Sequence, residues 1–267
     1  MKKKIDIFYL SFIILGIIVI ILILLPPLKT ILYTPISTLW HTILDQEVSF
    51  SISITVIAAL AATAFGFLLG VPLAYLLARH YFFGKRVLEA IIDIPIVIPH
   101  SAAGVALLFV FGRNFFIGKV FSAIGIDFFQ TFNGVVLAMM FVSVPFLIDS
   151  AKEGFRAIDI ELEETAYTYG ASHWQVFWYI SLPLALKNIY SGCILMWGRG
   201  VSEFGAVMII AYNAFFLGKS GKVLPVLVSD RFNFGLSYAR PIAALAILIS
   251  LIFFVILRIL ITRNENT

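Results

Sequence analysis

The chain has 267 residues, of which 61% are hydrophobic and only 13% charged, and its mean hydropathy is +1.02. Soluble domains carry about 25% charged residues, so this composition excludes a water-soluble protein with a polar surface. The net charge of +4 does not indicate nucleic-acid binding, because Lys and Arg in a membrane protein mainly report its topology. The single Cys193 excludes an internal disulfide.

Apolar runs separated by charged or turn-rich breaks predict an all-α membrane protein with about six spanning helices. A helix needs about 20 apolar residues to cross a bilayer, so residues 1–267 are expected to form a single transmembrane domain. The six runs lie near Ile7–Leu28, Phe50–Ala78, Ile92–Phe111, Phe132–Ile148, Ile189–Tyr212 and Pro241–Ile261.

The first run follows three lysines, which is also typical of a signal peptide. It exceeds a typical signal core, however, and it ends in Pro26 and Pro27 without a small-x-small cleavage site. We therefore expect an uncleaved first span.

Six spans place both termini on one side of a plasma membrane, and the basic residues favour the cytoplasmic side. That side would hold Lys2, Lys3, Lys4, Arg79, Lys85, Arg86, Lys152, Arg156, Lys187, Arg258 and Arg263. The other side would hold Lys29, Arg113, Lys119, Lys219, Lys222, Arg231 and Arg240. Eleven bases against seven predict cytoplasmic N- and C-termini.

Prolines interrupt several predicted spans, at Pro72, at Pro95 and Pro99, and at Pro145. Proline removes a backbone donor and bends a helix, and the freed carbonyl must find another partner in protein or in a water-filled cavity. These helices either line a path through the membrane or are ordinary kinked packing helices.

Small residues recur four apart in the second span, at Ala62, Gly66 and Gly70. This spacing allows a neighbouring helix to approach closely. The contact lies either within the chain or across a dimer.

The break between the fourth and fifth spans, 149–187, is predicted to contain two short helices. Asp159 can cap the first, and Glu161, Glu163 and Glu164 suit its N-terminal dipole. Gly170 can end it in the left-handed conformation. Ser172 and Gln175 form a plausible capping box for the second helix, and Pro183 is expected to end it.

Trp174, Phe177 and Trp178 are spaced to share one face of the second short helix. An aromatic face on the cytosolic side fits either burial at the membrane interface or insertion into a groove of a partner. The neighbouring His173 either joins that docking surface or is simply exposed.

The same segment carries a family signature. Glu164-Thr165-Ala166, Gly170-Ala171 and Ile180-Ser181-Leu182-Pro183 resemble the EAA loop of permease subunits of ABC importers, with Thr165 in place of the usual first alanine. The resemblance implies a homodimer whose cytoplasmic loops dock on two ATPase subunits. The coupling residues that it implies, together with the aromatic face, are Glu164, Ala166, Gly170, Ala171, Trp174, Phe177, Ile180, Leu182 and Pro183.

Three further segments, Asp93–Gly104, Arg199–Gly205 and Leu224–Arg231, resemble permeases of the molybdate, tungstate and sulfate group, and the molybdate/tungstate branch resembles them most. The resemblance implies import of a tetrahedral oxyanion that an external solute-binding protein delivers. The alternatives are a sulfate or thiosulfate permease, or a stand-alone secondary carrier.

ATP hydrolysis is expected on a partner subunit. The string nearest to a phosphate loop, residues 213–220, lacks the first glycine and falls in a predicted external loop. No metal-ligand cluster or nucleophile–base pair is apparent, so we expect neither a cofactor nor an enzyme.

Arg199 and Glu203 are four residues apart in the fifth predicted span, and therefore on one helix face. An ionised residue in mid-bilayer costs about 2.5–3.5 kcal/mol, so the pair should face protein or water. The two side chains either neutralise each other in a packed interface or line an anion path, in which Glu203 keeps Arg199 from binding the anion too tightly.

His100, after Pro99, is better interpreted as a hydrogen-bonded histidine at a helix break than as a metal ligand. Pro99 and His100, like Arg199 and Glu203, are candidate residues of the translocation path.

The external segment Phe215–Arg240 carries four bases and one acid. Its positive charge would attract anions or an acidic partner surface, unless it is only a solvated loop.

Overall fold

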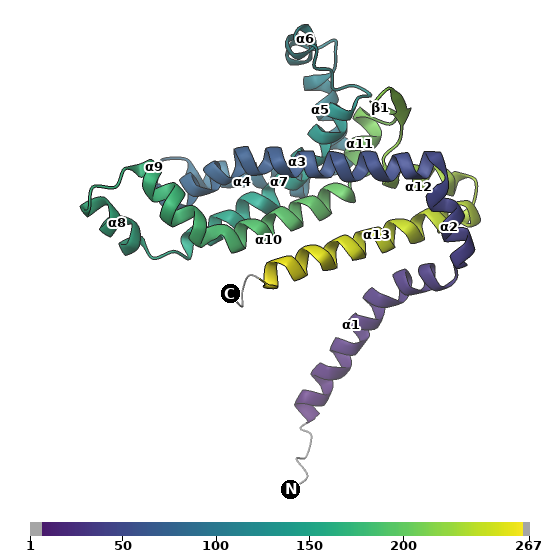
Figure 1. Cartoon of the computed structure of the whole chain (residues 1–267), viewed down its shortest axis with the longest axis horizontal. Coiled ribbons are helices and arrows are strands. Elements are labelled where there is room, and N and C mark those ends of the chain that lie inside the picture. The colour runs from purple at the N-terminus through teal and green to yellow at the C-terminus, as the bar shows by residue number, and fades with distance from the viewer. Residues whose placement is uncertain (1–6, 264–267) are drawn as a thin grey trace.

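Long apolar helices dominate the computed structural model, which describes residues 7–263 (Figure 1). Five helices in this range are long and apolar enough to cross a membrane, and a sixth span results if one bent helix pair is counted. The all-α polytopic prediction is confirmed. The strands in the described range form one hairpin of β1 (Ala214–Phe216) and β2 (Lys219–Gly221).

The five long spans are α1 (Ile7–Leu32), α3 (Gln46–Arg79), α7 (Phe132–Arg156), the run 173–201 and α13 (Leu236–Arg263). In Figure 1, α1 diverges from the other long helices towards its N-terminal end, while it still contacts α13. No residue of its apolar window is buried. The short helix α2 (Ile36–Leu44) connects α1 to α3.

The core forms where α3, α7 and α10 (Leu182–Val201) pack together. A Cβ at Gly66 would lie 2.4 Å from Met196 Cε, and a Cβ at Gly70 would lie 3.1 Å from Ile148 Cγ1. The small residues of α3 therefore make their close contact within the chain, which decides between the two alternatives that the sequence left open.

The third predicted span, Ile92–Phe111, is wrong as a single helix. It consists of α4 (Lys85–Val97) and α5 (His100–Phe111), whose axes differ by 113°. Pro99 precedes the first residue of α5, and the residue before a proline avoids the helical region, so Ile98 is extended. In Figure 1, α5 rises away from the long helices and carries α6 (Phe116–Ala123) at its end.

The prediction that Pro183 ends the second cytoplasmic helix is also wrong. The four-residue α9 (His173–Val176), the π-helical turn η1 (Phe177–Ser181) and α10 form one continuous run. Pro183 lies in the first turn of α10, directly after the π turn, in which Leu182 N donates to Phe177 O. A proline removes one helical hydrogen bond, and the wider turn accommodates this loss.

The fifth predicted span, Ile189–Tyr212, also contains a break. α10 ends at Val201, and the short α11 (Gly205–Ile210) follows. The two remaining helices are α8 (Ile160–Thr168), between α7 and α9, and α12 (Leu224–Asn233), between the hairpin and α13.

Candidate functional site

The segment between α7 and α10 lies at one end of the long helices, on the left in Figure 1, whereas α2 and α12 lie at the other end. Its predicted caps are confirmed. Asp159 accepts a hydrogen bond from Glu161 N, and Gly170 has a φ of +85°. Ser172 and Gln175 form the reciprocal capping box, with distances of 2.7 and 3.3 Å. Local sequence therefore determines where α8 and α9 begin and where the chain turns after α8.

A buried ion pair attaches this segment to the membrane helices. Glu163 Oε1 accepts from Arg79 Nε at 3.0 Å and from Arg79 Nη2 at 2.9 Å, and Ser181 Oγ donates to the same oxygen at 2.7 Å. Arg79 also donates to Ile158 O at 3.3 Å. The side chains of Arg79 and Glu163 are 8% and 6% exposed. One carboxylate thus joins the end of α3, helix α8 and the π turn.

Sequence reasoning assigned Glu163 only to the dipole of α8 and missed this role. The neighbouring Glu164, which carries the family signature, is exposed. The spacing of Glu161, Glu163 and Glu164 gave no signal to separate them. Only the fold shows which of these acids is buried.

The aromatic residues of α9 and η1 divide between two environments. Phe177 packs on Tyr75 and Phe155, with ring centroids 5.0 and 6.3 Å away, and so faces the bundle. Trp174 and Trp178 are 72% and 54% exposed. The three rings are neighbours, as their spacing predicts, but only the two tryptophans are available to another molecule.

The remaining residues of the signature lie along the same segment. Gly170 and Pro183 are exposed, whereas the others are half-buried: Ala166, Ala171, Ile180 and Leu182.

A second cluster forms where two helix breaks meet. Arg199 Nη2 lies 3.0 Å from Glu203 Oε2 and 2.6 Å from His100 Nε2. His100 Nδ1 lies 3.7 Å from Glu203 Oε2. The Glu203 side chain is 1% exposed, against 23% for Arg199 and 38% for His100. The predicted contact between Arg199 and Glu203 is present, although Glu203 lies beyond the end of α10.

Glu203 also holds the start of α11, because its Oε1 accepts from Ala206 N at 2.8 Å. Two glycines allow α5 and α11 to meet here. A Cβ at Gly205 would lie 2.8 Å from His100 Cβ, and a Cβ at Gly104 would lie 2.8 Å from Ala206 O. The cluster therefore depends on a backbone approach that larger residues would block.

His100 has the role expected from its position, a hydrogen-bonded histidine at a helix break, with Pro99 as the N-cap of α5. Among the residues that the structure describes, no group of three His, Cys, Asp or Glu side chains could hold a metal ion. The arrangement fits a site in which the positive charge of Arg199 is partly neutralised by Glu203.

Ion pairs engage half of the bases in the predicted external segment. Lys222 forms an ion pair with Asp230, which also accepts from Tyr212 OH, and Arg231 pairs with Glu47. Burial disfavours the charged form of Lys222, but its hydrogen bonds to Asp230 and Tyr212 outweigh that effect and raise its pKa. Two of the four bases, Lys222 and Arg231, thus have an acidic partner, whereas Lys219 and Arg240 form no ion pair with any described residue.

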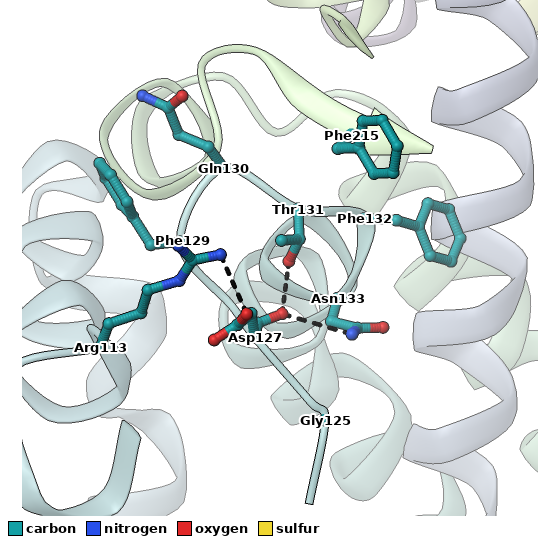
Figure 2. Close-up of a pocket in the computed structure, with 9 residues that line it drawn as sticks. All are labelled: Arg113, Gly125, Asp127, Phe129, Gln130, Thr131, Phe132, Asn133 and Phe215. Atoms are coloured by element: carbon teal, nitrogen blue, oxygen red, sulfur yellow. Dashed lines mark hydrogen bonds and ion pairs between the residues drawn. The ribbon is translucent and has the colours of Figure 1, made fainter. Parts of the chain in front are cut away.

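Residues 213–220, which lack the first glycine of a phosphate loop, form most of the β1–β2 hairpin, and two open hollows adjoin it. Figure 2 shows the first, of about 520 Å³, where Arg113 Nη2 contacts Asp127 Oδ2 at 2.9 Å. The second, of about 410 Å³, adjoins the start of α3. The lining of the first is Arg113, Gly125, Asp127, Phe129, Gln130, Thr131, Phe132, Asn133 and Phe215.

Comparisons with known proteins agree with this architecture. The family model described as "Binding-protein-dependent transport system inner membrane component" matches residues 66–266. The chain is 41% identical over 231 residues to a molybdate/tungstate transport system permease protein of Thermococcus kodakarensis, covering 86% of this chain and 85% of the relative. It is 36% identical over 192 residues to a probable sulfate transport system permease protein of Chlorokybus atmophyticus, covering 72% and 66%.

A solved structure shares the fold. The crystal structure of a bacterial alginate ABC transporter, in complex with its pentasaccharide-bound periplasmic protein, contains a chain with a TM-score of 0.72 and 17% identity. The similarity covers 94% of this chain and 92% of that one. Because the family model spans most of the chain, this protein belongs to the family of binding-protein-dependent transport system inner membrane components.

Proposed function

We propose that this chain is the membrane-spanning subunit of an ATP-driven importer of tetrahedral oxyanions, with molybdate and tungstate as its substrates. The observation that carries the transport role is the cluster of Arg199, Glu203 and His100, where two helix breaks meet. The substrate proposal is supported by the 41% identical relative, whose printed name states molybdate and tungstate. The sulfate relative, at 36% over a shorter share of the chain, supports the second candidate.

The cluster has the chemistry of a conduit. An unpaired guanidinium in a low-dielectric site would hold a divalent oxyanion too firmly to release it. Glu203 and His100 occupy one edge of the Arg199 guanidinium, whose side chain keeps 23% of its surface exposed. Arg199 can therefore attract an anion and let it go.

The energy would come from partner subunits. Two copies of this chain and two ATPase subunits would form the transporter in the bilayer, with an external solute-binding protein on the side of the hairpin. The 149–187 segment would be the coupling loop. Glu164, Trp174 and Trp178 are its exposed side chains suited to an ATPase groove, while Glu163 and Phe177 attach it to the bundle.

The orientation implied by this assembly can be tested by cysteine labelling. Replacing Cys193 by Ser removes the only thiol, and Tyr169→Cys and Ser220→Cys then place single thiols at exposed positions near the two ends of the bundle. We expect a membrane-impermeant maleimide added to intact cells to label position 220 alone. After permeabilisation it should label both positions. Labelling of position 169 in intact cells would contradict both the cytoplasmic termini and the coupling role.

The proposed activity is tested by uptake into proteoliposomes that contain this chain, its ATPase and binding proteins of differing oxyanion preference. Molybdate, tungstate and sulfate are tetrahedral dianions, and a single compensated arginine has little means to separate them by size. We expect ATP-dependent uptake that follows whichever anion the docked binding protein delivers. Uptake at the same rate without ATP would favour the secondary carrier. Exclusion of a delivered sulfate would mean that the membrane path itself selects.

A further inference from the structure

The turn between α3 and α4 presents aromatic side chains to the surroundings. Within residues 80–86, called here the aromatic–basic segment, Tyr81 is 94%, Phe82 45% and Phe83 107% exposed. Gly84, with a φ of +86°, closes the turn and leaves no protein atom within 4 Å of a potential Cβ. Three neighbouring exposed aromatic rings would be unfavourable in water, so this surface requires a partner.

The same segment ends in two basic residues. Lys85 Nζ lies 4.5 Å from the centroid of the Tyr81 ring, and Arg86 is exposed and forms no hydrogen bond or ion pair with any residue that the structure describes. Glu89, the next acid in the sequence, pairs instead with two bases of α7. The positive charge of the segment is therefore available to an anionic partner.

The length of α3 places the segment at the level of the lipid headgroups. Its 34 residues extend about 51 Å, whereas a bilayer including its headgroups is about 40–45 Å thick. A helix that crosses the whole membrane with a moderate tilt therefore ends among the headgroups. The aromatic–basic segment begins directly after its last residue, Arg79.

Exposed apolar side chains flank the segment on both sides. Leu76, one turn before the end of α3, is 49% exposed. On α4, Val87, Ile91 and Ile94 form an exposed stripe at positions i, i+4 and i+7. The neighbouring Leu88 and Ile92 pack against the core instead. These surfaces suit acyl chains, so they favour lipid over a water-soluble ATPase subunit as the neighbour of the segment.

We propose that the aromatic–basic segment binds anionic phospholipid headgroups of the cytoplasmic leaflet, an inference that rests on the orientation given under the proposed function. The aromatic rings occupy the interface, where such side chains are enriched in membrane proteins, and Lys85 and Arg86 contact the lipid phosphates. Because Arg79 holds Glu163 of the coupling loop, the bound lipid also fixes the end of α3 beside that loop.

The test places a reporter in the segment. Phe83→Cys in the Cys193→Ser chain is labelled with an environment-sensitive fluorophore and reconstituted, as the full transporter, in phosphatidylcholine vesicles. Quenching by nitroxide-labelled phosphatidylglycerol is compared with quenching by nitroxide-labelled phosphatidylcholine and by aqueous iodide. We expect strong lipid quenching with a preference for the anionic lipid, and weak iodide quenching. The same fluorophore at Tyr169→Cys, in a sample without ATPase subunits, should show weak lipid quenching and strong iodide quenching.

Charge variants identify the cause of the preference. Lys85→Gln and Arg86→Gln should each lower the anionic-to-neutral quenching ratio by up to about fivefold. The matched control, Lys85→Arg with Arg86→Lys, keeps both charges and should keep the ratio. Iodide quenching equal to that at position 169, or protection only when the ATPase is present, would overturn the proposal. If lipid quenching fails while ATP-driven uptake proceeds, this inference is wrong and the proposed function stands.

Discussion

Arg79→Met is expected to lower the free energy of unfolding by about 3–5 kcal/mol and to stop ATP-driven uptake. The Glu163 side chain is 6% exposed and would lose its only ion-pair partner in the described structure, leaving a buried carboxylate with Ser181 as its remaining side-chain donor. Thermal unfolding of the purified chain in detergent, followed by uptake in proteoliposomes, measures both effects.

The double variant Arg79→Met with Glu163→Met tests whether the lost stability comes from the unpaired charge of Glu163. Replacing both members of a buried pair by apolar residues of similar size is often neutral, so the double variant should regain most of the lost stability. An Arg79→Met protein with an unchanged unfolding midpoint would show that water reaches the pair and that Glu163 does not hold α8.

Glu164→Lys is the matched control for the Arg79–Glu163 variants. Glu164 is adjacent in sequence but exposed, and the structure gives it no side-chain partner among the described residues, so its replacement should leave the unfolding midpoint unchanged. Uptake and stimulation of the ATPase should nevertheless fall, because the charge is reversed at the proposed interface. A loss of uptake without a loss of stability in Glu164→Lys, against the loss of both in Arg79→Met, would separate docking of the ATPase from attachment of the loop.

Local features of the coupling segment could be predicted from sequence because their causes lie within a few residues. The Asp159 cap, the left-handed Gly170 and the capping box of Ser172 with Gln175 each depend on contacts no more than three or four positions apart. The π turn could not be predicted. A proline after a helical pattern usually marks an end, whereas here the helix continues through a π turn whose Phe177 packs on the distant Tyr75.

The contacts that assemble the two sites join distant parts of the chain. Glu163 meets Arg79 across 84 positions, and Arg199 meets His100 across 99. A single sequence predicts a helix break at Pro99, but it gives neither the break after Val201, nor the 113° bend, nor the glycine contacts that bring α5 against α11. The contact between Arg199 and Glu203 was predictable because four positions separate them.

Arg199→Gln is expected to slow uptake about tenfold or more, since hydrogen bonds to a charged group contribute about 1.5–3 kcal/mol. It should also destabilise the protein by about 3 kcal/mol, because Glu203 would remain buried without its cation.

Glu203→Gln should retain the hydrogen bond from Ala206 N through its amide oxygen, and should leave the positive charge of Arg199 less compensated. We expect this variant to bind the oxyanion more tightly and to release it more slowly.

The double variant Arg199→Gln with Glu203→Gln decides between a structural pair and a conduit. Both charges are then absent, so Glu203 no longer leaves an unpaired buried carboxylate and the unfolding midpoint should recover in either case. If Arg199 serves the anion, uptake stays low while the assembled transporter still hydrolyses ATP, because a neutral amide cannot offset the charge of a dianion in a low-dielectric site. If uptake instead returned with stability, Arg199 and Glu203 would only neutralise each other, and the conduit role of Arg199 would be wrong.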